Sequence, residues 1–264
     1  AVDETKGQVL SYKGDIIETY YYSTSYGHTG DYEAWNLDKD AYGYLQGVWV
    51  RSEENPIDLS DEKSFLDYIS NVDSACYESD LKYFRWNTVL DFQGKDETLL
   101  HTIADRKEHQ PEAISYYKDA SKTEKTDSCS NFGSLQAIKV VKRNQSGVIL
   151  ELELDFQNGA VSVQSEYNMR AILGCGITNI SLLDGSSVEM SILPSAYISI
   201  QAKGDGTYAV LGGYGHGIGM SQNGAQKLCG QGFDYKRILN YFYQDTELTE
   251  LYQPQNMTKE EGGA

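Results

Sequence analysis

Residues 135–163 constrain the fold of this chain more than any other segment. Apolar residues alternate with glutamates over residues 148–154, a pattern typical of a strand that is buried on one face. Gln157-Asn158-Gly159 then has the composition of a tight hairpin turn, and a second β-prone run follows at residues 160–163. Another β-prone run precedes the alternating segment at residues 135–142. We therefore predict three sequential strands here, joined as antiparallel neighbours.

Further elements are predicted towards the two ends of the chain. Residues 8–12 and 16–22 are rich in β-branched and aromatic residues, and the turn Lys13-Gly14-Asp15 between them predicts a hairpin. Short helices are expected after three residues whose side chains can cap a helix N-terminus: Ser165, Ser221 and Asp234. The fold class that follows is α+β, rich in β-structure, with hairpins, short C-terminal helices and a partly helical polar insertion.

The insertion is residues 53–131, where the sequence becomes more polar and more charged and shows only weak helical periodicity. We predict that residues 1–52 and 132–252 form the core and that residues 53–131 form an insertion or subdomain. Residues 253–264 contain little to bury, and we predict a flexible tail.

Charge and composition narrow the function. The 264 residues carry 39 acidic and 22 basic side chains, a formal net charge of −17, which disfavours nucleic acid and anionic membrane surfaces as partners. No run approaches the roughly 18–20 apolar residues that span a bilayer, so no membrane span is predicted in this chain. The 21 tyrosines suit contact with hydroxyl-rich ligands, although tyrosine is also common in strands.

Four cysteines are widely spaced and form no CxxC pattern: Cys76, Cys129, Cys175 and Cys229. We therefore predict no metal site, and the sequence indicates no cofactor. If the protein is exported, an even number of cysteines allows two disulfides, and a Cys76–Cys129 bond is the first choice. Four unpaired buried thiols are the alternative.

Residues 212–225 contain the most unusual motif, a glycine-rich run with His216 between two glycines. It lacks the Lys-Ser/Thr of a phosphate-binding loop and the register of a dinucleotide-binding motif. An imidazole flanked by glycines can exchange hydrogen bonds with a substrate hydroxyl, and Ser221 and Gln222 add polar groups. A tight structural turn is the alternative. The other histidines are scattered, without metal-ligand spacing: His28, His101 and His109.

A second polar cluster is Ser23-Thr24-Ser25, at the end of a predicted strand. Its three hydroxyls could line a sugar-binding groove, or could bond to the backbone of their own loop. Acidic residues are too numerous for the sequence to select a catalytic one. Those beside the ordered motifs, Glu18, Glu33 and Glu166, each have a structural explanation as well.

Taken together, these motifs resemble the SpoIID/LytB family, named after stage II sporulation protein D. The resemblance covers about residues 1–50 and 134–251, in the family's order. It rests on ETKGQVLSYKGDIIETYYYSTSYGHT at Glu4–Thr29, YEAW at Tyr32–Trp35, SGVILELEL at Ser146–Leu154, SEYNMRAILG at Ser165–Gly174, LPS at Leu193–Ser195 and GYGHGIGMSQNGAQKLCGQGFDYKRILNYFYQDTEL at Gly213–Leu248.

The resemblance implies an exported protein on the cell-wall face of a spore-forming Gram-positive cell, which acts on peptidoglycan glycan strands during engulfment. The family includes lytic transglycosylases that cleave strands stripped of stem peptides. In that reaction a carboxylic acid protonates the glycosidic oxygen, and the resulting carboxylate helps the 6-hydroxyl of the sugar to attack C1.

The family's catalytic glutamate belongs to a segment upstream of ETKG, and an ALKAQAVAARTY-like run is absent from these 264 residues. We therefore assign no catalytic residue here, and carry over no metal site. Tyr26 also departs from the family, which has glycine there, and we expect its ring to enter the groove. The resemblance implies that two loops face the glycan, through Ser23, Thr24, Ser25, His216, Ser221 and Gln222.

Three interpretations follow. The first is a lytic transglycosylase in the intact protein, with peptidoglycan glycan strands as its substrate. The second is a non-catalytic glycan-binding or amidase-modulating LytB-like protein, with a cell-wall amidase as an additional partner. The third is an acidic exported domain whose glycines serve only its fold.

Overall fold

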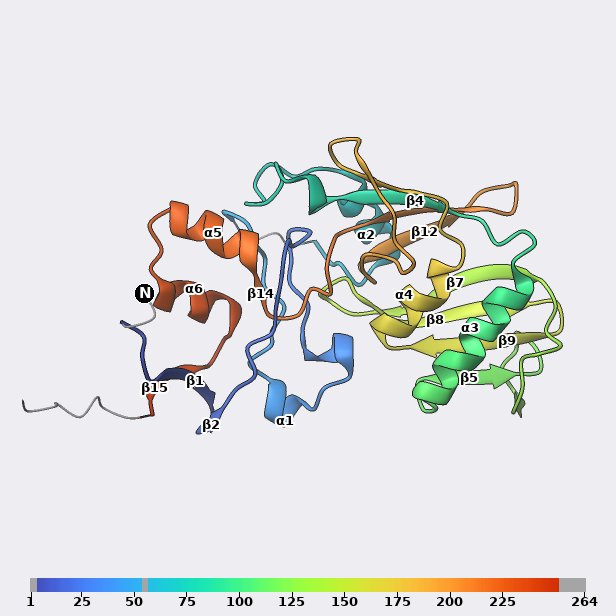
Figure 1. Cartoon of the computed structure of the whole chain (residues 1–264), viewed down its shortest axis with the longest axis horizontal. Helices are drawn as coiled ribbons and strands as arrows, with labels where there is room; N and C mark the ends of the chain where they lie inside the picture. The colour runs from blue at the N-terminus through green and yellow to red at the C-terminus, as the bar shows by residue number, and fades with distance from the viewer. Residues whose placement is uncertain (1–3, 54–56, 252–264) are drawn as a thin grey trace, which may run out of the picture.

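The computed structural model describes residues 4–53 and 57–251, and the predicted tail at residues 253–264 lies outside the described residues. Several sheets and short helices form a mixed, β-rich α+β fold, as predicted. In Figure 1, two larger sheets and helices α3 and α4 occupy one end of the molecule, and a small sheet with helices α5 and α6 occupies the other.

The first large sheet contains the three predicted strands. Its order is β6 (Lys125–Thr126), β5 (Ile114–Tyr117), β9 (Gly159–Gln164), β8 (Ile149–Phe156) and β7 (Leu135–Arg143), and all neighbours are antiparallel. Helices α3 (Asp96–His109) and α4 (Glu166–Gly174) pack on it. Strand β8 alternates as predicted, but its charged face is buried too. Glu153 on this face is buried and forms ion pairs with Lys122 and Lys139.

The second large sheet has the order β11 (Ser187–Val188), β10 (Ile180–Leu182), β4 (Trp86–Leu90), β13 (Tyr208–Gly212) and β12 (Ile198–Ala202). Its central strand β4 comes from the predicted insertion, as does β5 in the first sheet, so this segment shares sheets with the predicted core. The domain boundaries themselves stay a prediction. Residues of both sheets pack into one hydrophobic cluster, which includes Trp86, Leu152 and Val210.

The third sheet joins the two ends of the described chain. Strand β1 (Gln8–Tyr12) lies between β15 (Glu247–Glu250) and β2 (Asp15–Ile16), all antiparallel. The hairpin prediction was therefore right for its first residues but wrong beyond Ile16. There, Tyr44 and Tyr243 donate their hydroxyls to the carbonyls of Glu18 and Tyr20, and Tyr21–Tyr22 form a separate short strand, β3, instead of continuing β2.

A second hydrophobic cluster, including Leu45, Phe65 and Phe242, underlies this end of the molecule. The helical segments that contribute to it are η1 (Tyr32–Trp35), α1 (Lys39–Tyr42), α2 (Glu62–Ser70), α5 (Gln222–Gly230) and α6 (Tyr235–Phe242). The short helix η2 (Lys82–Phe84) instead contacts β10 of the second large sheet. No helix in the described ranges is both long enough and apolar enough to traverse a bilayer.

The predicted caps of α5 and α6 are confirmed. Ser221 accepts a hydrogen bond from the Gly224 amide at 3.2 Å, and Asp234 accepts one from the Arg237 amide at 2.8 Å. Ser165 precedes α4 as predicted, but its side chain makes no capping bond. Its φ of 71° departs from the extended backbone in which a capping hydroxyl reaches the first helical amides.

The Cys76–Cys129 disulfide, the first choice for an exported protein, is not formed, since all four cysteines are free. The Cys76 thiol lies 3.4 Å from the Tyr68 hydroxyl, whereas Cys129 packs in the cluster that contains both large sheets. The alternative of four buried thiols is right only for these two, because Cys175 is half-buried and Cys229 is exposed.

Candidate functional site

The two polar loops singled out in the sequence lie side by side. Strand β3 (Tyr21–Tyr22) pairs in parallel with β14 (Met220–Ser221), although about 200 residues separate them. Past the strands, the Asn223 amide donates to the Ser23 carbonyl at 3.0 Å, and the Asn223 side chain donates to the Thr24 hydroxyl at 2.9 Å. The serine-threonine loop and the glycine-histidine loop therefore form one continuous structure.

Glu78 holds the two loops together from inside. Its carboxylate accepts hydrogen bonds from the backbone amide of Ser25 at 3.0 Å, from the Ser25 hydroxyl, and from the Ser221 hydroxyl at 2.7 Å. Glu78 is fully buried, and this burial raises the pKa of its carboxyl while the serine donors oppose the rise. We call Glu78, Ser25 and Ser221 the Glu78 junction.

Sequence reasoning missed Glu78. It lies in the segment interpreted as an insertion, within Tyr77-Glu78-Ser79-Asp80, and no motif distinguishes it from the other acidic residues. Only the long-range pairing of β3 with β14 brings both serines to its carboxylate. A buried carboxylate without a neighbouring cation has to be held by hydrogen-bond donors, and the two polar loops provide them.

The predicted site residues divide into inner and outer groups. Thr24, Ser25 and Ser221 are fully buried, and their hydroxyls bond to protein groups, so they support the loops from within. Ser23 is half-buried and Gln222 is exposed at the start of α5. A ligand role for these residues stays a prediction.

His216 lies on the outer face with its ring fixed. Its Nε2 atom is 3.0 Å from the Tyr21 carbonyl, which can only accept, so Nε2 carries the proton. Its Nδ1 atom then accepts from the Ile218 amide at 3.2 Å. Burial lowers the pKa of His216, which favours this neutral form. Both ring nitrogens are therefore occupied, and the ring offers its face rather than a hydrogen bond.

Trp35 packs beside this ring, with centroids 4.9 Å apart and an interplanar angle of 39°. The Tyr20 ring also meets the indole edge-on, with centroids 5.1 Å apart. The indole Nε1 donates to Glu166 at 3.1 Å, and Arg170 forms an ion pair with the same carboxylate at 3.0 Å. We call the half-buried rings of Tyr20, Trp35 and His216 the Trp35 surface, which Glu166 holds in place from below.

Two glycines explain the glycine-rich sequence beside this surface. Gly217 and Gly219 have φ angles of 77° and 78°, a region that favours glycine. A Cβ on Gly219 would overlap the Tyr20 carbonyl oxygen, and one on Gly217 would overlap the Tyr197 ring. The motif is therefore required for close packing of the glycine-histidine loop against residue 20 and the core.

The expectation for Tyr26 is wrong, because its ring is buried rather than in a groove. Its hydroxyl donates to the Ser146 carbonyl, and its ring packs 5.0 Å from that of Tyr197. Within residues 4–53 and 57–251, no three His, Cys, Asp or Glu side chains are grouped so that they could hold a metal ion.

The structure thus defines the class of protein: a mixed α+β module in which a glycine-histidine loop is hydrogen-bonded to a serine-threonine loop. The chain is 26% identical to the amidase enhancer of Bacillus subtilis (strain 168) over 94% of its own length. It is 33% identical to stage II sporulation protein D of the same organism over 28% of its length. No family model matches the chain. These similarities relate the chain to the SpoIID/LytB family.

The matched regions make up 32% of the amidase enhancer and 22% of stage II sporulation protein D. The chain thus spans about a third or less of the length of each of these relatives.

Proposed function

We propose that this chain is a cell-wall module of the SpoIID/LytB type that binds peptidoglycan glycan strands at the Trp35 surface and acts at the outer face of the cell. The observation that carries the proposal is the joining of the two polar loops at the Glu78 junction, with the rings of Trp35 and His216 packed against each other on the outside. These loops belong to two of the segments on which the family resemblance rests.

The chemistry of the Trp35 surface fits a sugar. Aromatic faces pack against the C–H groups of pyranose rings, and an indole anchored by a buried carboxylate loses little side-chain freedom on binding. The exposed amide of Gln222, at the end of the glycine-histidine loop, can bond to sugar hydroxyls.

The similarity to the amidase enhancer supports the second of the three interpretations, because it extends over 94% of the chain. We propose that the bound module raises the activity of a cell-wall amidase during sporulation. Lytic transglycosylase activity of the intact protein is the alternative, supported by the match to stage II sporulation protein D. No described residue is assigned as its catalytic acid.

A binding assay with glycan strands freed of stem peptides tests the Trp35 surface. Trp35→Ala is expected to weaken binding about tenfold, which corresponds to about 1.4 kcal/mol. Tyr235→Ala is the matched control, because Tyr235 is an exposed aromatic residue on α6 outside this surface. Unchanged affinity of a folded Trp35→Ala protein would contradict the proposal.

The reaction products distinguish enhancement of an amidase from lytic transglycosylase activity. With peptidoglycan and a purified cell-wall amidase, addition of the chain is expected to raise the rate of peptide release. With amidase-treated peptidoglycan alone, mass spectrometry is expected to show no 1,6-anhydro ends. Anhydro-ended fragments would establish the transglycosylase alternative and would require a catalytic acid within this chain.

A further inference from the structure

A polar cavity of about 360 Å³ lies beside the serine-threonine loop, and the Trp35 surface does not include its lining residues. This volume falls within the range of about 300–1,000 Å³ that is usual for small-molecule sites. Its lining includes His28, Asp31, Trp49, Asp58 and Gln145, and we call it the His28 cavity.

His28 presents a hydrogen-bond acceptor to this cavity. Its Nδ1 atom lies 2.6 Å from the Thr29 carbonyl, which can only accept, so Nδ1 carries the proton of the neutral ring. Burial lowers the pKa of His28 to about 4, so the ring is neutral at pH 7. Its Nε2 lone pair has no hydrogen-bond partner among the described residues, although the side chain is more than nine-tenths buried.

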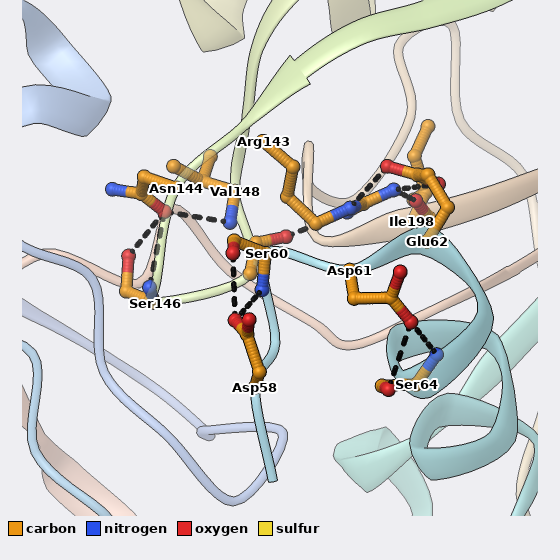
Figure 2. Close-up of polar contacts among 11 residues, drawn as sticks. Asp58, Ser60, Asp61, Glu62, Ser64, Arg143, Asn144, Ser146, Val148 and Ile198 are labelled. Atoms are coloured by element: carbon orange, nitrogen blue, oxygen red, sulfur yellow. Dashed lines mark hydrogen bonds and ion pairs between the residues drawn. The ribbon is translucent and has the colours of Figure 1, made fainter.

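Asp31 is the second acceptor, and its orientation is fixed by a chain of hydrogen bonds. The Asn144 side-chain oxygen accepts from the amides of Ser146 and Val148 and from the Ser146 hydroxyl (Figure 2). The Asn144 amide nitrogen must therefore face Asp31, and it lies 2.9 Å from both carboxylate oxygens. Burial raises the pKa of Asp31 to about 6.

The wall that carries Asn144 is itself anchored. Arg143, with a buried guanidinium, pairs with Glu62 through two hydrogen bonds of 2.7 and 2.9 Å, and it donates to the Gly147 carbonyl at 2.7 Å. Figure 2 shows these contacts next to the turn at Asp58, whose Oδ1 accepts from the amide and hydroxyl of Ser60. The Asn144 wall and the Asp58 turn are thus held by contacts within the protein.

Trp49 supplies an aromatic wall. Its ring is half-buried, and it meets the His28 ring edge-on at 4.7 Å and the Tyr68 ring at 5.5 Å. The cavity offers one aromatic wall, the acceptor atoms of His28, Asp31 and Asp58, and the amide of Gln145. These groups suit a ring that carries several hydroxyl donors. The described residues contain no grouping of side chains suited to a metal ion.

We propose that the His28 cavity is a second carbohydrate site, which takes a single N-acetylated pyranose ring, with its hydroxyls donating to His28 and the carboxylates and its apolar face on Trp49. This inference rests on the proposed function, since it adds a subsite for the same class of ligand. It differs in place, because none of its ligand contacts belongs to the Trp35 surface.

The three tryptophans allow both sites to be observed at once. Their indole N–H signals in a ¹⁵N-correlation spectrum are assigned with Trp35→Phe and Trp49→Phe, and buried Trp86, which donates to the Gly213 carbonyl, is an internal reference. N-acetylglucosamine is titrated first, followed by peptide-free glycan strands. We expect N-acetylglucosamine to shift the Trp49 signal to saturation, and glycan strands to shift the Trp35 signal.

Asp58→Asn tests the carboxylate, because asparagine keeps the oxygen that accepts from Ser60 but removes the charge. We expect about fivefold weaker binding of N-acetylglucosamine at Trp49. The matched control is Asp184→Asn, because Asp184 accepts the same pair of bonds from Ser186 on an exposed turn outside the cavity. It is expected to leave the affinity unchanged.

The outcomes separate the two proposals. A Trp49 signal that does not move with N-acetylglucosamine, while glycan strands still shift Trp35, overturns the second site and leaves the proposed function in place. The second site is also overturned if Asp58→Asn and Asp184→Asn change the binding of N-acetylglucosamine at Trp49 by the same amount. A shift at Trp49 without any response of Trp35 to strands supports the cavity and contradicts the Trp35 surface.

Discussion

Removal of the Glu78 carboxylate is expected to be among the most destabilising single changes in this protein. Glu78→Ala leaves three buried donors without their acceptor: the Ser25 amide, the Ser25 hydroxyl and the Ser221 hydroxyl. Each unsatisfied buried donor costs about 1–3 kcal/mol, and rotation of the two hydroxyls reduces part of that cost. We expect a loss of about 3–5 kcal/mol in the free energy of unfolding, against a usual total of about 5–15 kcal/mol.

Glu78→Gln separates the hydrogen bonds from the volume of the side chain. Glutamine fills the same space and keeps one acceptor oxygen, and the two hydroxyls can reorient to accept from its amide. The backbone amides of Ser25 and Gly224 cannot reorient in this way and still need an acceptor, so we expect a loss of about 1–2 kcal/mol.

Urea unfolding followed by tryptophan fluorescence measures both variants. Glu189→Ala is the control, because this exposed glutamate has no hydrogen bond or ion pair among the described residues, and its change should stay within about 0.5 kcal/mol. The reasoning is refuted if Glu78→Ala costs less than about 1 kcal/mol with an unchanged denaturant slope, or if Glu78→Gln costs as much as Glu78→Ala.

Three other predictions follow from single residues. In thermal unfolding, Gly219→Ala is expected to lower the stability by more than about 2 kcal/mol, because residue 219 has a positive φ and its new Cβ would overlap Tyr20. The control Gly230→Ala in α5 has open space around it and should be neutral or slightly stabilising. Because burial lowers the pKa of His28 from 6.5 to about 4, its stabilising contribution is complete above pH 6.5 and is lost as the pH falls to 4. Wild type should therefore lose about 3 kcal/mol more than His28→Gln between pH 7 and 4, and parallel curves would contradict this. With a thiol reagent under native conditions, exposed Cys229 should react first, while Cys76, whose pKa burial raises, should react only on unfolding.

Local patterns in the sequence predicted the parts of the fold that local patterns determine. Strands β7, β8 and β9 follow one another through short turns, and alternation in β8, β-prone composition in β7 and β9 and the turn residues between them were enough to identify them. The caps at Ser221 and Asp234 depend on side chains within three residues, and they too were predicted correctly. Ser165 failed as a cap because its backbone angle is set by the connection from β9, which composition does not reveal.

The candidate site depended on contacts that no local pattern encodes. That the two polar loops meet was a hypothesis from the family resemblance, and the parallel pairing of β3 with β14 establishes that they are neighbours. Glu78 was missed because its partners are 53 and 143 residues away in the sequence. For the hydroxyls of the serine-threonine loop, the sequence left sugar contact and bonds within the protein both open, since it does not distinguish a serine that bonds to protein from one that faces solvent.

The pairing of β1 with β15 has a mechanical consequence. Gln8 lies opposite Glu250, so the chain enters and leaves this small sheet at the same end of one antiparallel ladder. Hydrogen bonds in such a ladder run perpendicular to the strands, and a force that pulls the two ends apart loads them one after another rather than together. Under tension the ladder would therefore unzip at low force, while the Glu78 junction, whose residues lie outside it, stays closed.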